Sequence, residues 1–139
     1  MAVTEDRILE DRVTERRHDP DAERAWMRRL PIAWVAGVGS LMLFEPTPTN
    51  PNAHEPAWAV VAFFAFLSAL ALMTIGFARK ARWVFGVSGA AGVLGMMLSY
   101  ACMDSGHHLG AWWLIELGTF AALTTLSIPG ARFGDRRSP

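Results

Sequence analysis

The sequence predicts an all-α integral membrane protein, a bundle of four transmembrane helices with both termini in the cytoplasm. Three observations lead to this prediction: long apolar runs, positive residues that are confined to alternate connections, and a charged tail ahead of the first run. A helix rises about 1.5 Å per residue, so roughly 20 apolar residues cross a hydrocarbon core about 30 Å thick. The chain of 139 residues has room for one domain of this kind.

The chain divides into three parts by composition. Residues 1–29 hold eight acids and seven arginines and form a charged cytoplasmic tail, whereas residues 30–128 hold only four acids and three basic residues and form the transmembrane domain. Residues 129–139 form a short basic cytoplasmic C-terminus. Acids and bases alternate in the tail, so no basic patch for nucleic acid is formed.

Four transmembrane spans are expected at about residues 30–44, 58–77, 83–103 and 109–128. The last three are long enough and contain no Lys or Arg. The first covers only about 22 Å, and we expect the long arginine side chains before it and local thinning of the bilayer to make up the difference. A signal peptide is the competing interpretation of this run, but the preceding tail is long and acidic and no small-residue cleavage site follows.

The positions of the cationic residues predict the orientation. All thirteen Lys and Arg lie in the tail, in the connection 79–82, or near the C-terminus at Arg132, Arg136 and Arg137. The connections 45–57 and 104–108 contain none. Cationic loops are retained in the cytoplasm, so both ends are expected inside, in a multi-pass protein of the cell membrane.

The tail carries one local signal for a helix. Asp19, Pro20 and Asp21 combine a side-chain cap, a proline at the first helical position and an acid near the positive end of the helix dipole. We expect a juxtamembrane helix from about Pro20. Upstream, residues 5–17 are either a solvated, partly disordered arm or a helix that binds a partner.

Small residues recur along the third expected span and predict close helix packing. Inside a bilayer, helices associate through close contact of small side chains, because lipid tails are as apolar as the helices. We therefore expect this span at the centre of the bundle or at a dimer contact. The residues concerned are Gly86, Gly89, Gly92, Gly95, Ser88 and Ser99.

An offset of 54 residues aligns the first predicted hairpin with the second. It matches His54, Ala57, Trp58 and Phe66 with His108, Ala111, Trp112 and Phe120. A duplicated hairpin would give a parallel pseudo-repeat about an axis along the membrane normal. Chance similarity in a sequence rich in Ala, Leu and Gly is the alternative interpretation.

Glu116 is the one acid inside an expected span. A carboxylate in hydrocarbon is costly, so we expect Glu116 to face the bundle about 10 Å below the outer boundary, neutral and hydrogen-bonded to Ser40 or to a backbone carbonyl. Two roles are open. It acts either as a proton or cation relay, or as a hydrogen bond between helices.

The outer connections contain several side chains that bind metals. Cys102, Asp104, His107 and His108 lie close together in the sequence, and His54 with Glu55 of the other outer connection can join them. Thiolate with imidazole suits copper or zinc. The spacing matches no established metal motif, however, and an ordinary polar loop is the competing interpretation. We predict no other cofactor.

Motifs for phosphate binding, serine hydrolysis, zinc proteolysis and dinucleotide binding are missing. We therefore expect a non-enzymatic accessory or helper subunit that assembles with itself or with a larger membrane complex. The alternative is a small proton-coupled or metal transporter, or a metal-handling protein, that uses Glu116 and the connection from Cys102 to His108. A membrane oxidoreductase subunit that contacts quinone at the tryptophan-rich outer edge is a third interpretation.

Overall fold

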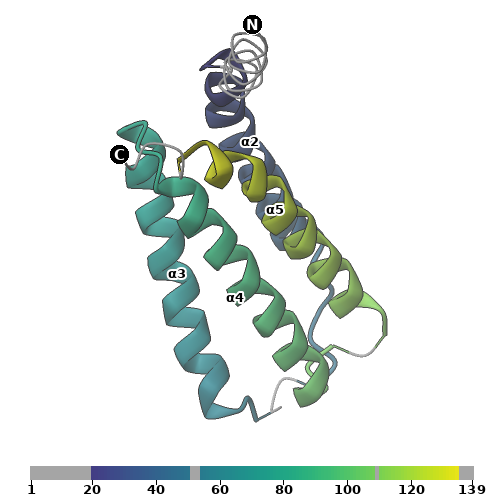
Figure 1. The fold of residues 1–139 in the computed structure, drawn as a ribbon. Coiled ribbons are helices and arrows are strands. Elements are labelled where there is room, and N and C mark those ends of the chain that lie inside the picture. Colours follow the sequence, from purple (N-terminus) through teal and green to yellow (C-terminus); the bar gives the residue numbers. More distant parts are fainter. Residues whose placement is uncertain (1–19, 51–53, 109, 135–139) are drawn as a thin grey trace, which may run out of the picture.

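The computed structural model is all-α over the residues that it describes, with four helices that alternate in direction (Figure 1). It describes residues 20–50, 54–108 and 110–134, so the arm expected at residues 5–17 lies outside the described residues. The helices are α2 (Pro20–Phe44), α3 (Ala57–Ala78), α4 (Val84–Ser105) and α5 (Trp112–Gly134).

The two ends of the molecule differ in their residues. The arginine end holds the start of α2 and the connection from Arg79 to Trp83, and the last turns of α5 lie there too (Figure 1). The histidine end holds the two remaining connections, which run from Glu45 to Pro56 and from Gly106 to Ala111.

The helix α2 unites two features that the sequence suggested separately. The expected juxtamembrane helix and the expected span 30–44 are one continuous helix, Pro20–Phe44, with Pro31 inside it. Continuous helix from Pro20 gives α2 a length of 25 residues, or about 37 Å. The apolar run 30–44 is therefore short, but the helix that contains it is not.

The helix α5 differs most from its expected bounds of 109–128. It begins at Trp112, because Gly110 adopts a φ of 106° that a right-handed helix does not accept. It also continues past Pro129 to Gly134. A proline inside a helix removes one backbone hydrogen bond, so the helix continues through Pro129 at a local cost.

The helix α4 lies between α3 and α5 and packs along both, while α2 packs along α5. Three rings fill the centre: Trp34 of α2 contacts Phe66 of α3 and Phe120 of α5, with centroids 6.5 and 6.4 Å away, and Phe66 meets Phe120 edge-on at 5.5 Å. Elsewhere α2 and α3 diverge, so the bundle is open along one side.

The small residues of α4 take different positions in this packing. Gly92 and Gly95 are buried against α5, where an added Cβ would collide with Thr124 and with the Phe120 ring, respectively. Ser88 and Ser99 are also buried. The expected row does not extend over its whole length, because Gly86 is exposed and Gly89 has only Ser127 near it at 4.0 Å. The close contact of α4 and α5 thus uses part of the predicted pattern.

Buried polar groups join three of the helices. The Trp34 indole N–H donates to Ser88 Oγ at 2.7 Å, and Ser88 Oγ shares a hydrogen bond of 2.6 Å with Ser127 Oγ. Ser127 Oγ also donates to the carbonyl of Leu123 at 2.8 Å. Because buried polar groups are costly when unpaired, this series of hydrogen bonds fixes the register of α2, α4 and α5.

The two hairpins that the 54-residue offset relates are packed differently. The second hairpin, α4 and α5, is closely packed along its length, whereas the first, α2 and α3, is open. Trp34 and Ser88, which the offset would superpose, are hydrogen-bonded to each other. Any duplicated origin has therefore not kept equal packing of the hairpins.

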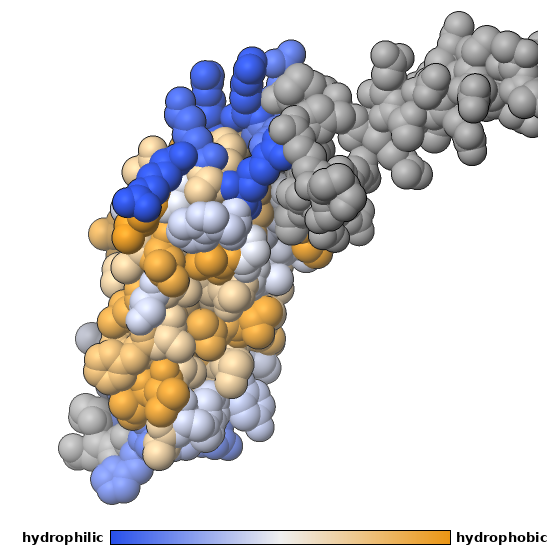
Figure 2. Space-filling view, turned by 60° about the vertical axis from the view of Figure 1, so that its left-hand side comes forward, coloured by the Kyte–Doolittle hydropathy of each residue, from blue (hydrophilic) through white to orange (hydrophobic). Residues whose placement is uncertain are grey.

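Large apolar side chains cover the middle of the surface, between hydrophilic ends (Figure 2). Of the helices that the structure describes, α3 and α4 are long and apolar enough to cross a membrane. Less than half of the most apolar stretch of each is buried within the protein.

Candidate functional site: a carboxylate pocket at the histidine end

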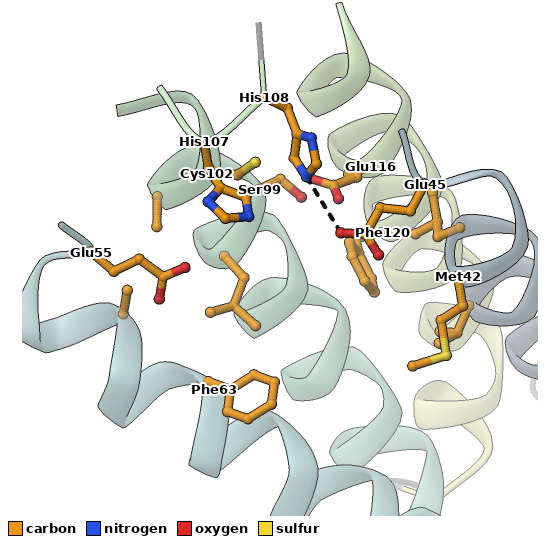
Figure 3. A pocket seen from close by; sticks show the side chains of 15 residues that line it. Met42, Glu45, Glu55, Phe63, Ser99, Cys102, His107, His108, Glu116 and Phe120 are labelled. Carbon is orange, nitrogen blue, oxygen red and sulfur yellow. Dashed lines mark ion pairs between the residues drawn. The ribbon is translucent and has the colours of Figure 1, made fainter. Parts of the chain in front are cut away.

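A cavity of about 440 Å³ lies at the histidine end of the bundle (Figure 3). All four helices or their adjoining connections contribute to its wall. We call it the carboxylate pocket. Its polar and ionisable lining residues include Glu45, Glu55, Cys102, His107, His108 and Glu116.

Backbone geometry brings the two connections of the histidine end together. Gly106 caps α4 with a φ of 67°, a left-handed conformation that glycine adopts without strain, and the chain then turns into His107 and His108. The carbonyl of His107 accepts the N–H of Thr49 at 2.9 Å and of Asn50 at 3.3 Å. The connection after α2 is thereby fixed to the connection after α4.

His108 is the most buried ionisable side chain of the pocket, with 2 % of its side-chain surface exposed. Its Nε2 atom lies 3.4 Å from Oε1 of Glu45, and this pair is drawn as a dashed line in Figure 3. Its Nδ1 atom is buried and makes no hydrogen bond within the described residues, and the same holds for Nδ1 of His107. The two imidazole rings are perpendicular, with centroids 4.8 Å apart.

Glu116 lies in the second turn of α5 and accepts a hydrogen bond of 3.0 Å from the indole N–H of Trp112. The prediction that Ser40 is the hydrogen-bond partner of Glu116 is wrong, since Ser40 is exposed. Trp112 precedes Glu116 by four residues on the same face of the helix, a spacing that the sequence displays. Because α5 begins at Trp112, Glu116 is only about 6 Å from the helix start, shallower than expected.

The lining of the pocket has an excess of negative charge. Among the residues that the structure describes, it holds three carboxylates and no Lys or Arg, and its two histidines are the lining side chains that can carry a positive charge. Two of the carboxylates come from the connection between α2 and α3, Glu45 at its start and Glu55 near its end, and the third, Glu116, comes from α5. A pocket so lined attracts cations.

Apolar and aromatic side chains complete the wall. Met42, Phe63 and Phe120 line the cavity together with aliphatic residues of α2 and α4. Rings attract cations through their π faces, and an apolar wall weakens the screening of nearby charges. The pocket therefore combines the two features that recognise an organic cation.

The structure separates the residues that the sequence proposed for a metal site. Cys102, His107 and His108 line the pocket together with Glu116, whereas Asp104 and His54 are exposed and do not line it. Within the described ranges, no three His, Cys, Asp or Glu side chains lie close enough to hold one metal ion. Glu45 was not predicted as a site residue. Its position directly after an apolar run was a usable signal for such a role.

Comparison with known proteins adds no relative. The chain matches no family model, no curated protein and no solved structure.

Proposed function

We propose that the chain is an integral membrane protein of four transmembrane helices, with both ends in the cytoplasm and the carboxylate pocket on the outer side. The apolar middle of the surface supports this, because α3 and α4 leave most of their apolar stretches unburied. The confinement of Lys and Arg to the arginine end and the two tails supports the orientation.

In this setting, the function that the pocket supports best is the binding of a positively charged organic solute from the outer side. The observation that carries the proposal is the convergence of Glu45, Glu55 and Glu116 on one cavity whose lining has no Lys or Arg. The cavity volume of about 440 Å³ is in the range of small-molecule sites and is large for a bare ion.

Binding of such a solute is coupled to protons in this proposal. Carboxylates bind either a proton or a cation, so a cationic solute that binds in the pocket competes with protons there. Proton release on solute binding is the first step of proton-coupled transport, the transporter class that Glu116 suggested in the sequence.

Binding of tetramethylammonium to the full chain in lipid nanodiscs tests the proposal. We expect saturable binding that the triple variant Glu45→Gln, Glu55→Gln, Glu116→Gln lowers by about tenfold or more. Asp104→Asn is the matched control, because Asp104 is an exposed acid at the same end that does not line the pocket. Equal binding by the wild type and the triple variant would refute the proposal.

A second candidate is the accessory subunit of a larger membrane complex, and the exposure of α2 favours it. Leu43 is 81 % exposed, Val35 and Met42 are each 76 % exposed, and Phe44 is 74 % exposed. Copurification of a stoichiometric partner in mild detergent supports this candidate, and its loss on Leu43→Asn would place the contact on α2.

A further inference from the structure

A second cavity lies on the open side of the bundle, between α2 and α3. Its volume is about 410 Å³, and its wall is formed mainly by apolar side chains of these two helices. We call it the apolar groove. Its lining residues include Pro31, Trp34, Val35, Val38, Gly39 and Met73.

The apolar groove and the carboxylate pocket are neighbours. Val38 lines both of them, and residues of α2 and α3 take part in both walls. Trp34 of the groove also contacts Phe120 of the pocket, with ring centroids 6.4 Å apart. Val38 therefore marks the boundary between the two cavities, and an elongated ligand that passes over Val38 would contact both.

Polarity changes in one direction along this path. Glu45 marks the charged end, and Pro31, 14 residues earlier on α2, marks the apolar end, a separation of about 21 Å along the helix. No ionisable side chain lines the groove. Val35 is 76 % exposed, so the groove is open at its side to whatever surrounds the bundle.

We propose that the ligand is a cationic amphiphile, whose charged head binds in the carboxylate pocket and whose hydrocarbon chain lies in the apolar groove. This inference rests on the proposed function and adds the class of solute. Charge complementarity selects the head, since the pocket carries three carboxylates. The wall that the two cavities share at Val38 favours the hydrocarbon chain as occupant of the groove, rather than a helix from another protein.

Gly39 provides a way to fill the groove without disturbing the fold. A Cβ at Gly39 would meet no atom within 4 Å, although the residue lines the groove. Gly39→Trp therefore places a large ring in the groove, while the carboxylates remain unchanged. Gly118→Trp is the matched control, since Gly118 also has no atom within 4 Å of its added Cβ and lines neither cavity.

The experiment compares dodecyltrimethylammonium with tetramethylammonium in lipid nanodiscs, with binding to empty nanodiscs subtracted. Because lipid tails are as apolar as the groove, only the comparison between variants at one chain length is informative. We expect Gly39→Trp to weaken dodecyltrimethylammonium binding by about tenfold or more and to leave tetramethylammonium within about twofold. Gly118→Trp should leave both affinities unchanged.

The outcomes separate this inference from the proposed function. If tetramethylammonium binds and Gly39→Trp leaves dodecyltrimethylammonium binding unchanged, the chain does not use the groove and only this inference fails. If neither cation binds the wild type, the proposed function fails with it. If neutral dodecyl maltoside displaces dodecyltrimethylammonium at equal concentration, the charged head gives no selectivity and the inference is overturned. Copurification of a protein that Gly39→Trp removes would assign the groove to a partner helix instead.

Discussion

Arg82 and Glu23 form a two-pronged ion pair, in which Nε donates to Oε1 at 2.7 Å and one terminal nitrogen donates to Oε2 at 2.6 Å. The pair joins the first turns of α2 to the connection between α3 and α4, and only 13 % of the Glu23 side chain is exposed. It closes the open side of the bundle at the arginine end. The Arg82 side chain therefore holds the start of α2 against the connection between α3 and α4.

Removal of this pair should loosen α2. We expect Arg82→Ala to lower the free energy of unfolding by about 1.5 to 3 kcal/mol, because a carboxylate in a partly buried site loses two charge-assisted hydrogen bonds. Denaturation of the purified protein in mixed micelles measures this. Arg24→Ala is the control: the Arg24 and Asp21 side chains are 77 % and 84 % exposed, and such pairs contribute about 1 kcal/mol at most. The double variant Glu23→Arg, Arg82→Glu should restore most of the stability. An equal loss of stability in Arg82→Ala and Arg24→Ala would contradict the role given to the Arg82–Glu23 pair.

The hydrogen-bond chain through Ser88 gives a second prediction. Ser88→Ala leaves the buried Trp34 indole N–H without its acceptor, and we expect a loss of about 1 to 3 kcal/mol in the free energy of unfolding. Ser68→Ala serves as the control, because Ser68 is exposed and bonds only to the carbonyl of Phe64 in its own helix. Its effect should stay within about 0.5 kcal/mol. Comparable stability of Ser88→Ala and Ser68→Ala would show that the hydrogen bonds through Ser88 do not hold α2 in place.

Two glycines of α4 should respond oppositely to the same substitution. An added methyl at Gly95 meets the Phe120 ring, so Gly95→Ala should destabilise the protein by about 1 to 3 kcal/mol through overpacking. At Gly86 the methyl meets nothing, so Gly86→Ala should be neutral or stabilise by up to about 1 kcal/mol through helix propensity. Thermal unfolding of both variants in one detergent compares them. Destabilisation of equal size at both positions would contradict the packing described for α4 and α5.

Binding of tetramethylammonium should weaken as the pH is lowered. Carboxylates attract a cation only when they are ionised, and a lower pH reduces the negative charge of the pocket lining. Titrations at a series of pH values measure the affinity, with Asp104→Asn retaining the same profile. An affinity that stays constant or rises towards low pH would contradict a role for these carboxylates.

Long apolar stretches separated by polar connections were sufficient to predict four helices, and two of them, α3 and α4, are long and apolar enough to cross a membrane. The bounds of α5 were less predictable. Its start depends on the left-handed backbone of Gly110, and its extension past Pro129 depends on tertiary surroundings that the local sequence does not encode.

The pocket was predictable only in part. Glu116, Cys102, His107 and His108 were visible as polar residues within or beside long apolar runs, but the sequence grouped them with Asp104, which the fold leaves exposed. The contribution of Glu45 depends on the backbone hydrogen bonds from Thr49 and Asn50 to His107, and such contacts between distant connections leave no local pattern.

The most direct test of the account is the sidedness of the two ends in intact cells. In a Cys102→Ser background, a cysteine is introduced either at His54, on the histidine end, or at Lys80, on the arginine end, since both positions are exposed. A membrane-impermeant maleimide should label His54→Cys in intact cells and Lys80→Cys only after permeabilisation. Labelling of Lys80→Cys from outside, or recovery of the chain in the soluble fraction without detergent, would contradict a four-span membrane protein with its carboxylate pocket facing outward.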